Sequence, residues 1–586
     1  MAFNIVCMPP QRFLMHNLPK NFPQRALKPN HTCHFRCSAI TQTFQDQRRS
    51  ANYQPTIWTD DFVKSLKSED MDELHKERSK ELEDEVRIMI GNKGARPLTL
   101  LQLIDDVERL GLGYRFSKDI TAALDRIIAM EGSNVGVEKS IHATALKFRL
   151  LRQHGYDVSQ DIFRSYKDHH GDFVEDLQND VKGLLSLYEA SFLAFEGENL
   201  LEEVKSFTMI HLEDIKGYID KSLVEKINHS LELPLHRRMC RLEARWYIDV
   251  YSKNKEANQS LLELAVLDFN MVQSTLQSDL KTVARWWKGV SLASKLNFIR
   301  DRLMECFFWT VGMIYEPSFS DCRIGLTQVT SLITTIDDIY DVYGSLDELQ
   351  LFTYVVKRWD ANAVKSLPHY MKLCFLALYN TVNGMAYDTL KENGINVIPI
   401  LSKAWADLCQ AFLVEAEWNY RKQTPTLEDY LENAWRSVSG NVILVHAYFL
   451  MSQNVTTEAL EYLERHHDIL KWSSMIFRLC NDLGTSTDEL QRGETANSIL
   501  CCMHQNGLSE KLAREHISNL ISEAWKKLNK GRVDDSPFSK HYLETAMNLA
   551  RISQCTYQYG DGHGAPDSRS KNRVLATIIE PIRLIK

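Results

Sequence analysis

Ile336-Asp337-Asp338-Ile339-Tyr340-Asp341 places three carboxylates at the end of a segment that we expect to be helical from residue 323 to residue 343. Asp337 and Asp341 are four residues apart, so their side chains project from one helix face about 6 Å apart. The helix dipole is negative at this end and disfavours each carboxylate by a few tenths to about 1 kcal/mol. Because Mg²⁺ and Mn²⁺ prefer carboxylate oxygens as ligands, the stretch predicts a metal site. A solvated acidic helix end without metal is the alternative.

The residues that follow predict where this helix stops. Gly344 is expected to end it in the left-handed conformation. Ser345 to Glu348 has the pattern of a capping box that opens the next helix. The three carboxylates are therefore expected in the last turns of one helix, close to the start of another.

A second polar cluster lies between Arg478 and Glu489. Asn481, Thr485 and Glu489 follow one another at intervals of four, so they share a face if the helix continues through Gly484. That glycine costs about 1 kcal/mol in a helix interior. A carboxamide, a hydroxyl and a carboxylate would suit another Mg²⁺ ion. A polar helix face or a capping sequence would carry the same spacing, but the combination with the first cluster favours metal binding.

Three arginines accompany the acidic clusters. The segment Arg300-Asp301-Arg302 ends 35 residues before Asp337, and Arg478 lies one turn before the second cluster. The planar guanidinium binds phosphate oxygens in a bidentate manner, and several converging arginines indicate a polyanion. Metals together with arginines predict a diphosphate ligand. Surface ion pairs are the alternative for Arg300 and Arg302.

Apolar and aromatic residues lie within two turns, or about 11 Å, of the charged groups on the same helices. These are Trp309 after Arg302, Thr330 before Asp337, and Phe477 before Asn481. They predict a pocket with a charged rim and an apolar, partly aromatic floor that accepts a hydrocarbon. An aromatic floor would also stabilise a carbocation left behind when diphosphate departs. A plain core role of Trp309 and Phe477 is the alternative.

Together these motifs resemble those of the plant class I terpene synthases. The resemblance runs from Arg48 to the C-terminus and includes DDIYD, the NDLGTSTDE form of the second metal motif, the RDR segment, LHRRM at 235–239 and YGDGHG at 559–564. Arg48-Arg49, separated by eight residues from Trp58, resembles the signature of the monoterpene synthases, which act on geranyl diphosphate. The resemblance implies an all-α fold with two helical domains. The C-terminal class I terpenoid synthase α-bundle would hold the active site, and the N-terminal α-barrel-like domain would be catalytically silent.

The resemblance also implies roles for individual residues. Three Mg²⁺ or Mn²⁺ ions are expected, held by Asp337, Asp341, Asn481, Thr485 and Glu489. The substrate is expected to contact Arg300, Arg302, Asp337, Asp341, Arg478, Trp309, Thr330 and Phe477. Catalytic roles are expected for Arg300, Asp338, Tyr557 and Asp561, with Asp338 behind the direct metal ligands. The segment from Tyr557 to Ala565 is expected to close over the mouth, and Arg48 and Arg49 to help cap it.

Some positions depart from the family pattern. Cys240 stands where a proline is usual, and Asn497 replaces a lysine that is frequent near the diphosphate site, so we assign no phosphate role there. Related isoprene synthases carry a bulky phenylalanine at the position of Thr330, and threonine leaves room for a ten-carbon chain. Phe477 matches their second phenylalanine, so formation of a hemiterpene such as isoprene stays open.

Composition bounds the remaining functions. The 586 residues are enough for two or more domains, and no run of 18 apolar residues predicts a membrane span. Residues 1–47 hold five basic residues against one acid, as in an organelle transit peptide. Because this segment has net charge +4 and the chain −8, residues 48–586 carry −12, which disfavours nucleic-acid binding. The 12 cysteines have no paired CxxC spacing and predict reduced thiols.

We therefore expect a plastid transit peptide at 1–47, an N-terminal helical domain at 48–265 and a catalytic domain at 266–586. The predicted protein is a monomeric monoterpene synthase of the chloroplast stroma, a lyase that ionises geranyl diphosphate to a cyclic or acyclic monoterpene. The alternatives are a sesquiterpene synthase acting on farnesyl diphosphate, an isoprene synthase, a prenyl-chain-elongating transferase and a non-enzymatic helical scaffold. The elongating transferase is disfavoured because it would normally carry two aspartate-rich motifs.

Overall fold

The computed structural model describes residue 48 and residues 51–66, 73–131, 140–451, 455–492 and 496–583. Over these residues the chain consists of α-helices with short 3-10 and π segments, and contains no strand beyond an isolated bridge between Lys167 and Phe173. From Arg48 onward it forms one compact unit. The predicted transit segment, residues 1–47, lies outside the described residues. None of the helices in these ranges has the length and apolarity to cross a bilayer.

The helices of the N-terminal half share a core built from α2, α3, α4, α9 and the first part of α10, with smaller clusters among α5 to α8. Amphipathic spacing accounts for this, as Leu82, Val86 and Ile90 on α2 recur every four residues and are buried. These helices are α2 (Glu73–Gly91), α3 (Pro97–Arg109), α4 (Ser117–Glu131), α5 (Ile141–Gln153), α6 (Val181–Ser191), α7 (Asn199–Ile215), α8 (Lys221–Glu232) and α9 (Cys240–Ser252), with 3-10 segments η1 (Gln160–Tyr166), η2 (Glu175–Asn179) and η3 (Leu235–Arg237).

The C-terminal half encloses a second and larger core, centred on α12, α13, α18, α20 and α23. Its helices are α11 (Leu292–Lys295), α12 (Leu303–Met313), α13 (Ser320–Asp338), α14 (Leu346–Arg358), α15 (His369–Asn393), α16 (Ile398–Arg421), α17 (Leu427–Ser437), α18 (Gly440–Met451), α19 (Thr457–Glu464), α20 (Asp468–Arg492), α21 (Ser498–Asn506), α22 (Glu510–Val533), α23 (Lys540–Tyr557) and α24 (Ser568–Val574), with η4 (Pro317–Phe319), η6 (Ala361–Ser366) and the π segments η5 (Ile339–Tyr343) and η7 (Leu575–Ile579). The prediction of an all-α fold is confirmed.

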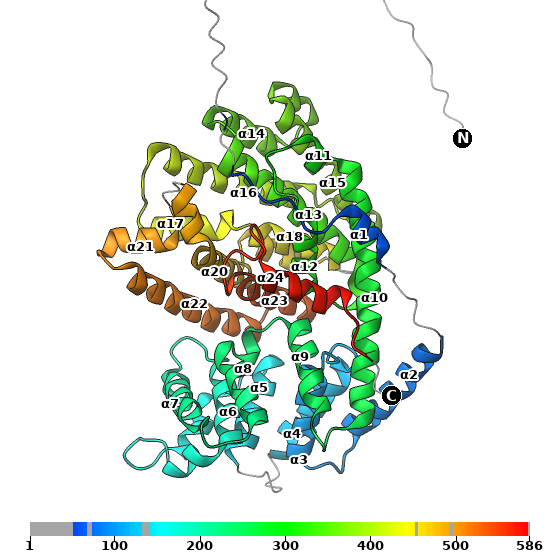
Figure 1. Cartoon of the computed structure of the whole chain (residues 1–586), viewed down its shortest axis with the longest axis vertical. Helices are drawn as coiled ribbons and strands as arrows, with labels where there is room; N and C mark the ends of the chain where they lie inside the picture. The colour runs from blue at the N-terminus through cyan, green and yellow to red at the C-terminus, as the bar shows by residue number, and fades with distance from the viewer. Residues whose placement is uncertain are drawn as a thin grey trace, which may run out of the picture. The chain divides into compact units, whose positions relative to one another are not determined.

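The long helix α10 (Gln259–Val290) connects the two cores and runs along both groups of helices (Figure 1). Its buried residues up to Phe269 belong to the first core, and those from Val272 onward belong to the second. Asn258 caps its start by accepting a hydrogen bond from the Leu261 backbone N–H at 3.0 Å. The domain boundary predicted between residues 265 and 266 falls inside this continuous helix and stays a prediction.

The helix that carries the first acidic cluster ends differently from the prediction. Helix α13 passes into the π segment η5, and Gly344 follows it with φ −70° and ψ 142°, so it is extended and not left-handed. Glycine is favoured for a different reason, because a Cβ there would lie 2.9 Å from the Ile339 carbonyl oxygen and 2.5 Å from Leu349 Cδ2. The predicted capping box is confirmed, since Ser345 and Glu348 each bond the other's backbone at the start of α14.

The helix that carries the second cluster continues through Gly484, as the face of three oxygen-bearing residues requires. A Cβ at Gly484 would lie 3.0 Å from Tyr557 Cβ and 3.2 Å from the Gly560 carbonyl oxygen. The glycine therefore lets α20 approach the segment that follows α23.

An extended N-terminal segment, residues 51–58, runs over the C-terminal core before α1 (Asp60–Ser65). The Trp58 indole N–H donates to Glu305 Oε1 at 3.2 Å, and the Gln54 carbonyl accepts from Arg302 at 2.9 Å. Just before this segment, Arg48 forms a two-point pair with Glu348, and one of its nitrogens also donates to the Tyr343 carbonyl at 3.2 Å. Arg49 lies outside the described residues.

Candidate active site

One cavity of about 190 Å³ in the C-terminal half brings the two polar clusters together. All the predicted site residues except Asp338 and Arg302 line it. These are Arg300, Trp309, Thr330, Asp337, Asp341, Phe477, Arg478, Asn481, Thr485, Glu489, Tyr557 and Asp561. Predicted residues as far apart in sequence as Arg300 and Asp561 therefore meet at one site. The i, i+4 patterns could not show this, because each of them concerns a single helix.

The first wall of the cavity is the end of α13 with η5. Arg300, which precedes α12, forms an ion pair with Asp337. The guanidinium of Arg300 also lies 5.0 Å from the ring centre of Tyr53 in the N-terminal segment. Tyr53 lines the cavity too. Sequence reasoning missed it because nothing in its neighbourhood marks it as part of a site.

Asp338 does not line the cavity and is fully buried. Its carboxylate accepts the Arg300 backbone N–H at 2.6 Å and lies 2.9 Å from Arg300 Nε. Burial raises the pKa of Asp338 to about 6 even though the positive charge of Arg300 opposes the shift. In this arrangement Asp338 contacts Arg300 and also has a side-chain hydrogen bond with Tyr53. The catalytic role expected for Asp338 stays a prediction.

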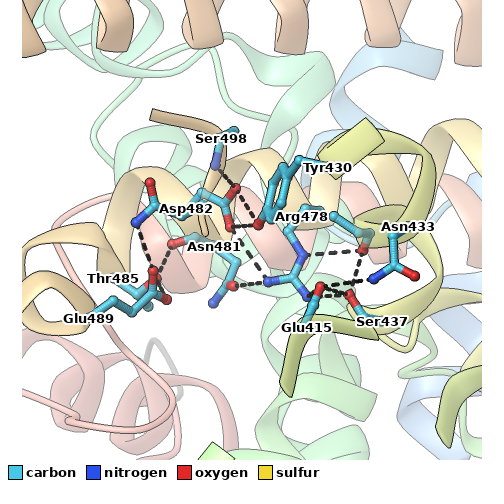
Figure 2. Close-up of polar contacts among 12 residues, drawn as sticks. Glu415, Tyr430, Asn433, Ser437, Arg478, Asn481, Asp482, Thr485, Glu489 and Ser498 are labelled. Atoms are coloured by element: carbon cyan, nitrogen blue, oxygen red, sulfur yellow. Dashed lines mark hydrogen bonds and ion pairs between the residues drawn. The ribbon is translucent and has the colours of Figure 1, made fainter. Parts of the chain in front are cut away.

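A second wall of the cavity is α20, drawn in Figure 2. The Thr485 hydroxyl lies 2.9 Å from the Asn481 carbonyl oxygen and 2.5 Å from Glu489 Oε1, so the three residues share one face. Asn497 donates its amide to Glu489 Oε2 at 3.1 Å, which gives this residue a place beside the cluster although the sequence predicted no phosphate role for it.

Arg478 is held at the cavity by groups on three helices (Figure 2). It donates to Asn481 Oδ1 at 3.1 Å on its own helix and to Ser437 Oγ at 2.9 Å on α17. Glu415 on α16 lies 3.9 Å from the same guanidinium. The arginine therefore reaches the cavity as predicted, and it fixes the side chain of a predicted metal ligand.

Asp482 is a buried residue that the sequence analysis did not assign. Its carboxylate accepts the Tyr430 hydroxyl at 2.9 Å and the Ser498 backbone N–H at 2.9 Å, and it lies 3.5 Å from Arg478 (Figure 2). Because consecutive residues of a helix point in different directions, Asp482 faces the protein while Asn481 faces the cavity. Its position in the acidic motif was the only signal available.

Arg302 departs from the prediction. It is buried, it does not line the cavity, and its guanidinium donates to the carbonyl oxygens of Gln54 and Gly564, both at 2.9 Å. Here it ties the N-terminal segment to the 557–565 segment. A diphosphate role would require these bonds to break, and stays a prediction.

The segment from Tyr557 to Ala565 lies at the cavity, as expected. Asp561 organises it by accepting the backbone N–H groups of His563 at 3.1 Å and Gly564 at 2.7 Å. The same carboxylate lines the cavity. Whether the segment moves to close the mouth stays a prediction.

Aromatic rings form the floor of the cavity. The rings of Trp309 and Phe477 lie 4.7 Å apart, and those of Phe477 and Tyr557 lie 6.3 Å apart and stack. His563 is a further lining residue that the sequence analysis missed; its Nε2 lies 3.2 Å from Thr334 Oγ1. Burial and the charges of nearby arginines lower the pKa of His563 to about 3, so the imidazole is neutral.

The donor set fits hard divalent cations. Oxygen donors line both walls, with carboxylates of Asp337 and Asp341 on one side and the Asn481, Thr485 and Glu489 groups on the other. Within the described ranges no three His, Cys, Asp or Glu side chains converge into a complete metal cage. An incomplete set of protein ligands suits Mg²⁺, because this ion usually keeps water ligands and completes its coordination shell with phosphate oxygens of the substrate.

The chain matches two family descriptions. Residues 57–231 match "Terpene synthase, N-terminal domain" and residues 288–527 match "Terpene synthase family, metal binding domain". The two polar clusters and the three predicted arginines fall within the second match.

Known proteins resemble the chain over most of its length. A probable terpene synthase of Ricinus communis is 58% identical over 539 residues, which cover 92% of each chain. A chloroplastic tricyclene synthase of Medicago truncatula is 56% identical over 547 residues, 92% of this chain and 93% of that one. A crystal structure of isoprene synthase from grey poplar leaves (Populus x canescens), in complex with three Mg²⁺ ions and dimethylallyl-S-thiolodiphosphate, is 55% identical with a TM-score of 0.84, and covers 91% of this chain and 100% of that chain.

These matches confirm the predicted resemblance and the class of fold. The matches exclude the alternative of a non-enzymatic scaffold, because both matched domains are domains of an enzyme family. The polar cavity agrees with this. With its N-terminal helical domain, its metal-binding domain and a cavity that joins both acidic motifs, the chain belongs to the terpene synthase family.

Proposed function

We propose that the protein is a monoterpene synthase that ionises geranyl diphosphate in the presence of three Mg²⁺ or Mn²⁺ ions. The observation that supports this most directly is the cavity itself, with oxygen donors and arginines on its walls and aromatic rings at its floor. Such a site can bind a diphosphate at one end and a hydrocarbon at the other. The three-ion count is supported by the complex of the poplar isoprene synthase.

The polar end of the cavity would bind the diphosphate. The metal ligands are expected to be Asp337 and Asp341 on one wall and the three residues of α20 on the other. Bound divalent ions would supply charge that stabilises the leaving oxygens. Arg300 and Arg478 line the same space and each already pairs with an acid, so a diphosphate would offer them a second anion to bind.

The apolar end would hold the isoprenoid chain and the carbocation left after ionisation. The faces of Trp309, Phe477 and Tyr557 surround this part of the cavity, and aromatic faces attract cations. The 557–565 segment, held by Arg302 and Asp561, would keep bulk water from the cation. The reaction would end by proton loss or by capture of a water molecule.

The length of the substrate is inferred from Thr330. Its hydroxyl donates to backbone carbonyls of its own helix, to Leu326 at 3.0 Å or Thr327 at 3.1 Å, so a small methyl-bearing side chain remains at the cavity wall. A ten-carbon chain has more room beside this threonine than it would have beside a phenylalanine at the same position. The tricyclene synthase relative supports the ten-carbon assignment, whereas the isoprene synthase relative and Phe477 keep a hemiterpene product as the second candidate.

The plastid is the proposed location. The basic composition of residues 1–47 supports it, and so does the chloroplastic name of the tricyclene synthase relative. A sesquiterpene synthase acting on farnesyl diphosphate would not be expected to carry such a segment. A monomeric state stays a prediction.

The test is turnover of purified protein with dimethylallyl, geranyl and farnesyl diphosphate, each with Mg²⁺. The proposal expects the highest kcat/KM for geranyl diphosphate, release of diphosphate, and ten-carbon products by gas chromatography. A preference for dimethylallyl diphosphate with isoprene as product would favour the second candidate. Consumption of added isopentenyl diphosphate would instead indicate chain elongation.

A further inference from the structure

A second, smaller cavity of about 20 Å³ lies behind the aromatic floor. Trp309 and His563 line both cavities, so they form the wall between them. The other side of the small cavity includes Trp58, Glu305 and Thr556. About 10–15 Å³ of such space is enough for one water molecule when polar partners are present.

Four buried polar atoms on the lining residues have no hydrogen-bond partner among the described residues. They are Glu305 Oε2, Trp309 Nε1, Thr556 Oγ1 and His563 Nδ1. Glu305 and Trp309 are 6% and 4% exposed, so bulk water does not satisfy them. A buried polar group without a partner costs about 1–3 kcal/mol, and folded proteins commonly place an ordered water at such a point.

The hydrogen bonds around His563 favour one of its two neutral tautomers. The Thr334 hydroxyl donates to the Thr330 carbonyl at 3.0 Å, so its oxygen is left to accept from His563 Nε2 at 3.2 Å. With Nε2 protonated and the imidazole neutral, Nδ1 is an acceptor. His563, one of the residues that line the small cavity, therefore carries a nitrogen that needs a donor.

The four atoms complement one water molecule. Glu305 Oε2 and His563 Nδ1 accept hydrogen bonds, whereas the Trp309 indole N–H and the Thr556 hydroxyl can donate them. Water donates two and accepts two. We propose that one ordered water molecule occupies this cavity, donates to Glu305 and His563, and accepts from Trp309 and Thr556.

This water is expected to influence the reaction products, and that expectation rests on the proposed function. The four hydrogen bonds hold this water behind Trp309 and His563 and so keep it away from the cation, and both of its lone pairs are engaged by donors. Thr556 supplies one of the two donors. Thr556 is then a specificity-determining residue, because its hydroxyl favours proton loss over capture of the water and so favours a hydrocarbon over an alcohol.

A crystal structure of the full chain tests the site without reference to catalysis. Burial raises the pKa of Glu305 to about 7, so crystals are grown at about pH 8, where the group is a carboxylate. The expected result is one water peak within about 2.7–3.2 Å of the four atoms. A dry cavity in a map that resolves other buried waters would overturn the proposal, as would direct pairing among the four atoms.

Two matched variants test the role of the hydroxyl. Thr556→Val keeps the shape and removes the donor, and Thr556→Ser keeps a hydroxyl. With geranyl diphosphate the ratio of alcohol to hydrocarbon is expected to rise by a factor of roughly 2 to 10 in the valine variant, the range that follows from one hydrogen bond, and to stay near wild type in the serine variant. Equal ratios in the two variants would overturn this role. Failure of the wild-type protein to release diphosphate would contradict the proposed function instead, and leaves the crystallographic test intact.

Discussion

The phenol of Tyr430 on α17 donates to the buried carboxylate of Asp482 on α20, with its oxygen 2.9 and 3.1 Å from the two carboxylate oxygens. Asp482 in turn lies beside Arg478, whose guanidinium holds the Asn481 side chain. A residue outside both metal motifs therefore fixes the geometry of the second one.

Tyr430→Phe is expected to lower the free energy of unfolding by about 1.5–3 kcal/mol, because it removes a hydrogen bond to a charged group. Tyr542→Phe is the matched control, since the Tyr542 hydroxyl is also buried but donates to a neutral carbonyl, that of Leu444, at 3.1 Å. That control should lose only about 0.5–1.5 kcal/mol. Urea titrations measure both, and equal losses would contradict the account.

Asp337→Ala is expected to reduce kcat at saturating Mg²⁺ by about 100-fold or more, because it removes a carboxylate from the proposed metal site. Asp347→Ala serves as the control, since that residue is exposed on α14 and does not line the cavity. Steady-state release of diphosphate is the measurement. Wild-type turnover by the Asp337 variant would refute its role as a ligand.

Gly484→Ala is expected to lower both stability and turnover. The new Cβ would crowd Tyr557 and Gly560, and overpacking of this kind costs about 1–3 kcal/mol. Gly531→Ala on α22 is the control, because a Cβ there meets nothing within 4 Å and alanine favours a helix by up to about 1 kcal/mol. Opposite shifts in thermal midpoint are expected, and a shift in the same direction would argue against the close approach.

Glu243 is expected to make stability depend on pH. Burial alone would raise the pKa of Glu243, but the hydrogen bond from His229 and the charge of Arg109 lower it from 4.5 to about 2. The folded state therefore binds fewer protons, so the contribution is present above pH 4.5 and lost as the pH falls toward 2, by at most about 3 kcal/mol. Unfolding free energies at about pH 5 and 3 should differ less in Glu243→Gln than in wild type. Glu256→Gln, at an exposed position, should keep the wild-type difference.

Thr330→Phe is expected to shorten the hydrocarbon site. The ratio of kcat/KM for geranyl diphosphate to that for dimethylallyl diphosphate should fall by about 10-fold or more, because the longer chain must pass a bulky ring. Thr330→Ser keeps a small side chain and should preserve the ratio. Competition between the two substrates measures it, and an unchanged ratio in the phenylalanine variant would remove Thr330 from the determinants of chain length.

The sequence was sufficient for the parts of the site that repeat along a helix. Asp337 and Asp341, and Asn481 with Thr485, follow the helical period, so their common faces could be predicted before their neighbours were known. The continuation of that helix through Gly484 was only a condition of the prediction, and the structure confirms it. The all-α fold followed from similar local patterns and from the family resemblance.

Contacts between distant segments could not be predicted in this way. Tyr430 and Asp482 are 52 residues apart, and Arg302 and Gly564 are 262 apart, so only tertiary packing defines either pair. Arg302 shows most clearly what the sequence cannot predict. An arginine donates hydrogen bonds to carbonyl oxygens as well as to phosphates, so the residue type alone does not identify its partner. Gly344 is another example, since glycine permits both a left-handed turn and a close approach.

The segment from Tyr53 to Trp58 has a practical consequence for preparing the recombinant protein. Tyr53 borders the reactive cavity, Gln54 anchors Arg302, and Trp58 reaches Glu305. A recombinant start site chosen at α1 would delete this edge of the cavity while leaving in place all the helices that the structure describes. Such a shortened protein could pass a circular dichroism check and still be a defective catalyst, so expression should begin no later than Arg48.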